Sequence, residues 1–133
     1  KPRRESDLQR EILRYLALVP GVVAWKNGTG AFRKPYVAKD GSRREHFIRI
    51  GKVGAADITG WVSMCMVISC DAAVAGCKNE NHLLARRLEI EVKAKNGKPT
   101  PEQAAFLAQV HAAGGLAILA YSLDDVRKEL PTP

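Results

Sequence analysis

The sequence lacks a long apolar run, and its cysteines are few. No stretch approaches the roughly 20 apolar residues of a membrane-spanning helix, so we expect no transmembrane segment. The basic start, KPRRESD, is not followed by the apolar core of a signal peptide, which favours a cytoplasmic location. Three cysteines cannot all pair, and 133 residues can form a core without disulfides. Internal repeats and low-complexity linkers are also missing, so we expect one domain over residues 1–133.

The cysteine spacing argues against a zinc site. Cys65, Cys70, Cys77 and His82 follow the pattern C-x4-C-x6-C-x4-H, whereas zinc sites usually contain close CxxC pairs. Buried or idle thiols are the simpler interpretation. These residues lie in a segment of about 64–87, less regular in its second half, which we interpret as an insertion between two strands.

Positive charge is concentrated in the first part of the chain. The formal net charge is +7 and the pI about 9.6, which favours a polyanionic partner. Residues 1–52 hold 13 Lys and Arg against 5 Asp and Glu, whereas residues 53–133 hold 8 against 9. One interpretation is a generally solvated basic surface. The other is a basic binding surface separate from an acidic site, the arrangement that a metal-dependent nuclease needs.

The stretch LEIEVKAK, residues 88–95, alternates apolar and charged residues. This period of two predicts a half-buried strand, with branched apolar side chains on one face and Glu89, Glu91 and Lys93 on the other. Such a charged face is either exposed to solvent or holds a cation and an anion together. A divalent metal bound to a phosphate would fit the second description.

Two helices present polar residues towards the expected core. Over residues 4–18, Leu8, Ile12 and Leu16 recur every four positions, and Glu5 falls on the same stripe. A glutamate in the first turn is also favoured by the helix macrodipole, which is the alternative reason for Glu5.

Thr100, Pro101 and Gln103 predict the start of a second helix that ends at about residue 113. Thr100 is a good N-cap, and Gln103 completes a capping box. Gln103 also falls on the apolar stripe, so it either caps the helix or points towards the preceding strand. An apolar strand over residues 116–121 and a last helix over 123–130 complete the chain.

The basic region between residues 31 and 50 predicts a hairpin with its tip at residues 40–42, where Asp and Gly favour a turn. Strands are expected over residues 21–27 and from about Asp57. A hairpin that carries both cations and aromatic rings is suited to clamp a phosphate backbone, although an ordinary solvated hairpin would have the same composition. The cations expected to contact a nucleic acid are Lys26, Arg33, Lys34, Arg43, Arg44, Arg49, Lys52 and Lys95.

This element order predicts an α/β fold with a mixed central sheet flanked by helices. The strand–helix–strand unit over residues 88–121 should be a right-handed crossover between parallel strands.

Asp57 followed by Glu91-Val92-Lys93 resembles the signature of the PD-(D/E)XK nuclease superfamily. The finer resemblance is to its VRR-NUC branch, which occurs in phage, bacterial and DNA-repair nucleases. It also includes residues 5–9 (ESDLQ), residues 54–57 (GAAD), Gln103 and the two glycines at 114–115. Ala56 stands where the family has proline. The resemblance implies a restriction-endonuclease-like αβββαβ core.

The resemblance further implies a metal-dependent mechanism. Asp57, Glu91 and the backbone carbonyl of Val92 would bind Mg²⁺ or Mn²⁺, hard cations that prefer oxygen ligands. Lys93 would orient or activate the attacking water. Glu5 would act as a ligand through water or as a partner of Lys93. Two further residues complete the expected set: Gln103 would touch Lys93 or the phosphate, and Glu89 would be a supporting or solvent-exposed residue.

The implied substrate is DNA. A small VRR-NUC domain suggests a bacterial or phage-encoded endonuclease that acts as a homodimer on four-way junctions or other branched DNA, because a twofold dimer supplies two active sites. No small-molecule cofactor and no membrane partner are expected. A non-catalytic nucleic-acid-binding module that keeps the nuclease fold is the alternative, and one domain of a larger restriction or repair protein is a further possibility.

Overall fold

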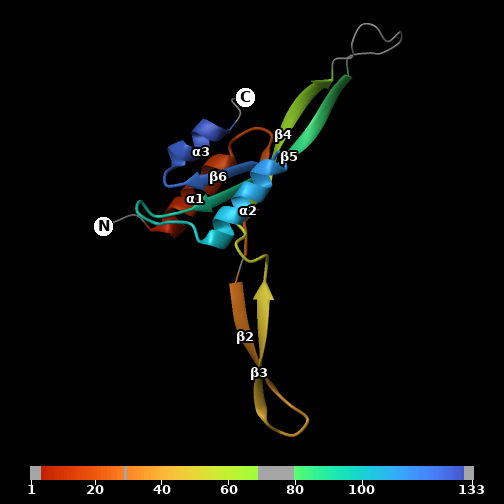
Figure 1. The fold of residues 1–133 in the computed structure, drawn as a ribbon, viewed down its shortest axis with the longest axis vertical. Helices are drawn as coiled ribbons and strands as arrows, with labels where there is room; N and C mark the ends of the chain where they lie inside the picture. Colours follow the sequence, from red (N-terminus) through yellow and green to blue (C-terminus); the bar gives the residue numbers. More distant parts are fainter. Residues whose placement is uncertain (1–3, 29, 69–79, 131–133) are drawn as a thin grey trace.

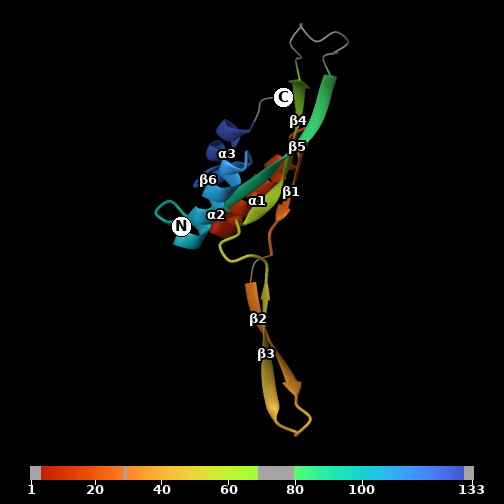
Figure 2. The ribbon, with the colours of Figure 1, turned by 45° about the vertical axis from the view of Figure 1, so that its right-hand side comes forward.

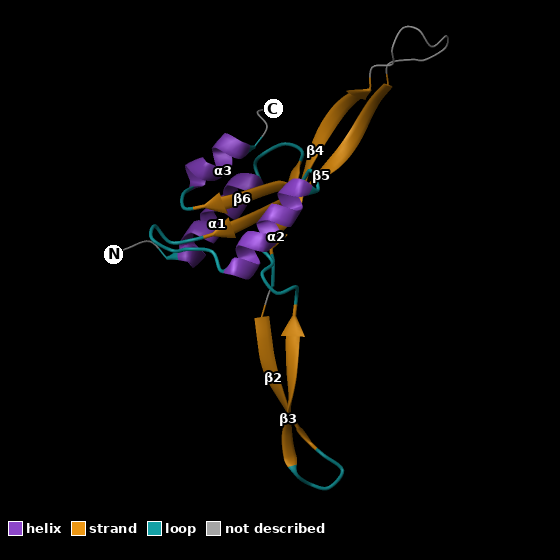
Figure 3. Ribbon diagram, viewed as in Figure 1, coloured by secondary structure: helices purple, strands orange, loops and turns teal. Residues whose placement is uncertain are grey.

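The computed structural model describes residues 4–28, 30–68 and 80–130. Its main sheet has the strand order β1-β4-β5-β6 (Figures 1 and 3). Neighbours are antiparallel except for β5 and β6, which are parallel as the sequence predicts for a crossover. The bounds are Val22–Lys26 for β1, Ile58–Ile68 for β4, Glu80–Val92 for β5 and Leu116–Ala120 for β6. The expected α/β class with a mixed sheet is confirmed.

Helices cover both faces of this sheet. Helices α1 (Glu5–Leu16) and α3 (Leu123–Glu129) pack on one face, and α2 (Pro101–Ala112) packs on β5 and β6 from the other. Successive side chains along a strand point to opposite faces of the sheet, so each strand packs against the helices on both faces. None of the helices in the described part of the chain has the length and apolar character needed to span a membrane.

The larger core lies between the sheet and α1. Leu8, Ile12 and Leu16 form the buried stripe of α1, as their spacing predicts. Across from them, residues 88, 90 and 92 of β5 are fully buried, so the period-two prediction is confirmed for this face. The helix ends at residue 16 rather than 18 because a turn begins there and leads to the positive-φ glycine at position 21.

The charged face of β5 is not exposed. Glu89 is 0% and Glu91 1% accessible, so the solvent-exposed alternative for Glu89 is wrong and the supporting role is the alternative that remains. The reason is that α2 packs over this face, with Phe106 and Val110 in a second, smaller core cluster. The strand also differs in length from the prediction, since β5 begins at residue 80 and ends at 92, just before Lys93.

Helix α3 begins as its sequence predicts. The Ser122 hydroxyl accepts a hydrogen bond from the Asp125 N–H, and the Asp125 carboxylate accepts from the Ser122 N–H. These reciprocal bonds satisfy backbone donors that the first turn of a helix leaves unpaired. They hold the pKa of Asp125 below its ordinary value, with the Tyr121 N–H the largest cause.

The basic hairpin forms a separate two-stranded sheet. Strands β2 (Gly30–Val37) and β3 (Arg43–Ile50) pair antiparallel and project away from the body of the protein (Figures 1 and 2). Its tip is where the sequence predicts it. Gly41 has a φ of +80°, and Ser42 donates to the Asp40 carboxylate from both its N–H and its hydroxyl.

The segment expected to be an insertion is, in its described part, a continuation of β4 and β5. The two strands remain paired from Met64 opposite Leu84 to Ile68 opposite Glu80. They form a second ribbon that extends beyond the helices (Figure 1). Residues 69–79, including Cys70 and Cys77, lie outside the described residues, and Cys65 is an exposed thiol that is not in a disulfide.

Candidate active site

Glu91 is the centre of the candidate site. Its side chain points from β5 towards the α2 side of the sheet and is almost completely buried. The Lys93 ammonium lies 2.7 Å from Glu91 Oε1, yet neither carboxylate oxygen receives a well-directed hydrogen bond from the described residues. Buried carboxylates normally accept several hydrogen bonds, so a carboxylate with an ion pair at one oxygen and no partner for the other among the described residues is unusual.

Asp57 lies next to Glu91, immediately before β4. Asp57 Oδ2 accepts a hydrogen bond of 2.9 Å from the Val92 N–H, which ties the start of β4 to the end of β5. The Asn27 N–H donates to the Asp57 carbonyl, and the Asn27 amide donates to the carbonyl of Ala56. The loop before β4 is therefore held on both sides, and the two carboxylates predicted to act together are neighbours.

Glu5 reaches the same end of β5 from α1. Glu5 Oε1 accepts a hydrogen bond of 2.9 Å from the Ala94 N–H, just beyond Lys93. The inward orientation predicted from its helical phase is thus confirmed. Its position in the first turn also suits the macrodipole, so the two interpretations of this residue are compatible. Lys95 and Lys93 line a cavity together with Glu5.

The charged side chains of this cluster shift one another's pKa values. Burial raises the pKa of Glu91 above its ordinary value of 4.5, and the negative charges of Asp57 and Glu5 raise it further. The Lys93 ammonium lowers it, but by less than the other effects raise it. Burial alone would lower the pKa of Lys93. The ion pair with Glu91 and the charges of the other two carboxylates outweigh it, so the pKa of Lys93 lies above 10.5. Negative charge is in excess here, and a cation would be stabilised.

Gln103 adopts the capping geometry. Its Oε1 accepts from the Thr100 N–H at 2.8 Å, and its own N–H donates to the Thr100 hydroxyl at 3.2 Å. The capping box is confirmed, and the side-chain oxygen of Gln103 is turned towards Thr100. A contact from Gln103 to Lys93 or to a phosphate stays a prediction.

Glu89 belongs to a second buried network that sequence reasoning missed. Its Oε1 accepts from the Thr59 hydroxyl at 2.6 Å and from two nitrogens of Arg87 at 2.7 and 2.8 Å. Thr59 is the residue opposite Glu89 on β4. Alternation along a strand puts Thr59 on the same face as Asp57, but only the strand register shows which residue it faces.

The cations predicted to bind DNA divide into several groups. Most lie on the projecting hairpin, where Arg33 pairs with Glu45 at 3.3 Å and Arg44 with Asp40 at 2.7 Å on an exposed surface. Exposed pairs of this kind are weak and exchange readily for phosphate contacts. The remaining cations of the hairpin are Lys34, Arg43 and Arg49, and those on the body are Lys26 in β1, Lys52 beside α2 and Lys95 near Lys93.

Gly54 holds the loop of Asp57 against α2. Its φ is +76°, a conformation that favours glycine, and a Cβ here would lie 2.5 Å from the backbone carbonyl oxygen of Glu102. Ala56, at the position where the PD-(D/E)XK signature has proline, is buried beside Phe106 and Val110. The loop therefore packs closely on α2 without the proline.

The described residues contain no ready-made group of three or more His, Cys, Asp or Glu side chains placed to hold a metal ion. Two of the three carboxylates, those of Asp57 and Glu5, are instead turned to backbone N–H groups, while Glu91 faces Lys93. The chain thus brings together four of the five predicted catalytic side chains, with hydrogen bonds that a bound cation would have to replace in part.

Comparisons with known proteins give no match. No family model, curated protein or solved structure matches this chain. The function is therefore inferred from the geometry of the cluster and from the residue pattern that it shares with the nuclease signature.

Proposed function

We propose that this protein is a divalent-metal-dependent DNA endonuclease of the PD-(D/E)XK superfamily, in its VRR-NUC branch, with the restriction-endonuclease-like core. One observation carries the proposal. Glu91, buried and without a directed hydrogen bond, lies with Asp57, Glu5 and Lys93 at one end of β5, although these residues come from three separate parts of the chain. A structural ion pair alone would not need three carboxylates around one lysine.

The residues present fit a divalent metal ion. Glu91 Oε1 lies 2.7 Å from the Lys93 ammonium, and its Oε2 has no hydrogen-bond partner among the described residues. Burial is the largest cause of its raised pKa, and the negative charges of Asp57 and Glu5 act in the same direction. Asp57, Glu91 and the Val92 carbonyl would hold the ion, with Glu5 as a ligand through water. A bound Mg²⁺ or Mn²⁺ would polarise the scissile phosphate and lower the pKa of a coordinated water.

Lys93 supplies the positive charge on the protein side. Its ammonium is mostly buried, and the three carboxylates keep it protonated. A protonated lysine donates hydrogen bonds, so Lys93 orients the attacking water and offsets the charge that develops on the phosphoryl oxygens. Glu5, anchored on the Ala94 N–H, fixes the backbone beside Lys93 and limits where the ammonium can lie.

The proposed substrate is branched or duplex DNA, cleaved by a homodimer. The β2–β3 hairpin projects well beyond the body (Figure 2), and Arg33, Lys34, Arg43 and Arg44 on it are exposed, as a phosphate clamp requires. Two copies related by a twofold axis would present two active sites to the two symmetric strands of a four-way junction. This part of the proposal rests on family analogy.

A cleavage assay on four DNA structures tests the proposal. The protein is incubated with labelled four-way junction, flap, single-stranded and linear duplex DNA, with Mn²⁺ or with chelator. We expect cleavage only with metal and preferentially of branched DNA. Asp57→Ala and Lys93→Ala should each abolish it without unfolding the protein, as checked by circular dichroism. Binding without cleavage of any substrate would favour the non-catalytic module, and uniform cutting of all four would contradict the preference for branched DNA.

Gly54→Ala is expected to lower cleavage about 100-fold. The added methyl group would collide with the Glu102 carbonyl, so the loop must move away from α2 and Asp57 moves with it. A displacement of about 1 Å in a catalytic group can cost this much in rate. Gly114→Ala is the matched control, since Gly114 also has a positive φ of 83° but open space around its Cβ position. Equal activity of the two variants, measured with the preferred DNA, would contradict the role of the contact.

A further inference from the structure

Both tryptophans of the chain lie together on an open part of the sheet. The rings of Trp25 on β1 and Trp61 on β4 are 5.6 Å apart at an interplanar angle of 74°. They are 47% and 39% exposed, and the neighbouring Val23 is 46% exposed. Large aromatic rings that remain half-exposed next to each other often mark a binding surface.

This surface is on the same side of the sheet as the candidate active site. The register places Trp25, Thr59 and Glu89 opposite one another on three adjacent strands. Glu91 follows two residues later on β5, about 7 Å further along the same face, and β1 is about 10 Å from β5 across the sheet. Helix α2 packs on β5 and β6, so the tryptophans on the other half of this face remain accessible.

Arg87 connects the tryptophans to the groove beside α2. It lies opposite Trp61, and two of its nitrogens bind the buried Glu89 while the side chain remains 62% exposed. Its guanidinium is 6.0 Å from the Phe106 ring, and the Lys52 ammonium is 5.0 Å from the same ring.

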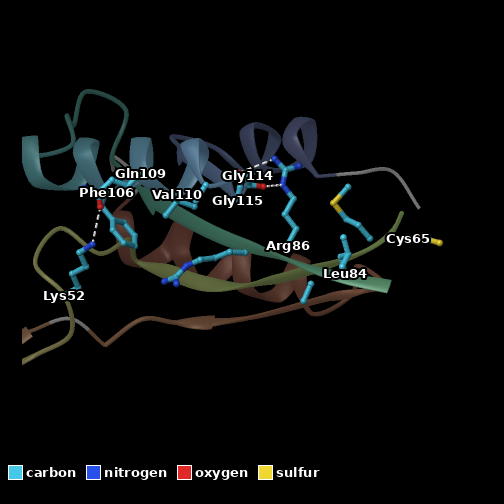
Figure 4. A pocket seen from close by; sticks show the side chains of 13 residues that line it. Lys52, Cys65, Leu84, Arg86, Phe106, Gln109, Val110, Gly114 and Gly115 are labelled. Atoms are coloured by element: carbon cyan, nitrogen blue, oxygen red, sulfur yellow. Dashed lines mark hydrogen bonds between the residues drawn. The ribbon is translucent and has the colours of Figure 1, made fainter. Parts of the chain in front are cut away.

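Figure 4 shows the groove that these residues border. Lys52 bonds to Gln109 of α2 towards one end of the groove, and Arg86 bonds to the carbonyls of the two glycines before β6 further along it. The groove is apolar on its floor and has cations along its rim. A ligand that fits this combination has both apolar groups and negative charges.

We propose that Trp25 and Trp61 form a stacking platform for unpaired nucleobases of a DNA strand, with Arg87 and Lys52 contacting its phosphates. The inference rests on the proposed function and narrows its substrate to DNA with single-stranded nucleotides next to the cleavage site. Bases in a duplex are stacked on each other, whereas unpaired bases stack on exposed aromatic side chains irrespective of sequence.

A second copy of this chain is the less favoured occupant of this surface. The net charge of +7 opposes self-association through a face that itself carries Arg87 and Lys52, and it attracts a polyanion. The indole rings offer a stacking surface, and the cations beside them match the phosphates of the same strand. The alternative predicts tryptophan burial that depends on protein concentration and not on DNA.

Intrinsic fluorescence tests the platform directly, because both tryptophans of the chain belong to it. The full chain is titrated in chelator with an oligothymidine, with an abasic oligomer of the same length and charge, and with a blunt duplex. We expect strong quenching by the oligothymidine and little by the abasic oligomer or the duplex. Equal quenching by the abasic oligomer would overturn the proposal, since electrostatic attraction alone would then explain binding.

Substitutions of each tryptophan by leucine or phenylalanine test whether the aromatic rings are needed for binding. In anisotropy titrations with labelled oligothymidine, Trp25→Leu and Trp61→Leu should weaken binding about tenfold each, the loss expected for one stacked base, while Trp25→Phe and Trp61→Phe should bind nearly as the wild type does. Leucine keeps the apolar surface and removes the aromatic face. Unchanged binding of both leucine variants would overturn the proposal, as would tryptophan emission that shifts on dilution without DNA.

The outcomes separate this inference from the proposed function. Quenching by single strands without any cleavage in Mn²⁺ would support the platform and contradict the nuclease. Metal-dependent cleavage without quenching would support the nuclease and contradict the platform.

Discussion

Glu91→Gln is expected to abolish metal-dependent cleavage and to stabilise the metal-free protein. The substitution keeps the size of the side chain but removes a charge that would bind the metal ion. A loss of at least about 1000-fold in rate corresponds to about 4 kcal/mol of transition-state stabilisation, which is reasonable for a direct metal ligand. The loss should therefore bring the variant close to the background of the assay.

The gain in stability follows from the raised pKa of Glu91. A carboxyl group whose pKa is higher in the folded than in the unfolded state binds more protons when folded, so stability falls as the pH rises above 4.5 through the raised pKa. Glutamine avoids this loss. Lys93 does not become an isolated charge, because Asp57 and Glu5 remain beside it and also raise its pKa.

Thermal unfolding in chelator measures this effect. We expect the Tm of Glu91→Gln to equal that of the wild type near pH 4.5 and to exceed it by a few degrees at pH 8. In a domain of this size, each kcal/mol of unfolding free energy corresponds to about 4 °C in Tm. Glu129→Gln, at an exposed position of α3, is the control and should show no such difference. A Tm difference that shrinks as the pH rises would contradict the assigned pKa shift.

Gly60→Ala is expected to destabilise the fold by about 3 kcal/mol or more. A Cβ at this position would overlap the carbonyl oxygen of Val23 and lie 2.7 Å from the Cα of Ala24. Both contacts are with the backbone of β1, so no side-chain rotation relieves them, and β1 must move away from β4. The Tm should fall by about 12 °C.

The same variant should disturb the tryptophan pair. Because β1 carries Trp25 and β4 carries Trp61, separating the strands would alter the emission of both rings. Gly28→Ala is the matched control, since a Cβ at Gly28 would meet nothing within 4 Å. A Tm of Gly60→Ala within 2 °C of the control would mean a difference in unfolding free energy of only about half a kcal/mol. That result would contradict the close approach of β1 and β4.

Local signals account for much of the fold. Thr100 and Ser122 begin α2 and α3 because their hydroxyls accept from the first turn, and this chemistry needs only three following residues. The turn at Gly41 is set in the same way, by its neighbours and its positive φ. The helical phase of Glu5 was also readable, since Leu8 and Ile12 define the buried stripe.

Features that depend on distant packing were not predictable in the same way. The length of β5 follows from its pairing with β4 far beyond the helices, which the sequence pattern of residues 64–87 does not reveal. Gln103 satisfied both the capping and the inward pattern, and only the structure shows its oxygen on the Thr100 N–H. The burial of Glu89 was also undetermined, because an alternating pattern predicts the two faces of a strand but not which helix covers each face.

The sequence by itself determined most of the elements and the concentration of positive charge near the hairpin, because periodicity, capping and composition are local properties. The candidate set Asp57, Glu91 and Lys93 came from the resemblance of the sequence to the nuclease signature. Only the tertiary structure decided that α2 buries the charged face of β5 and that Glu91 lacks directed hydrogen bonds among the described residues. It also decided that Trp25 lies beside Trp61. Burial and cross-strand neighbours depend on register and on helix packing, and these arise from contacts between residues far apart in the chain.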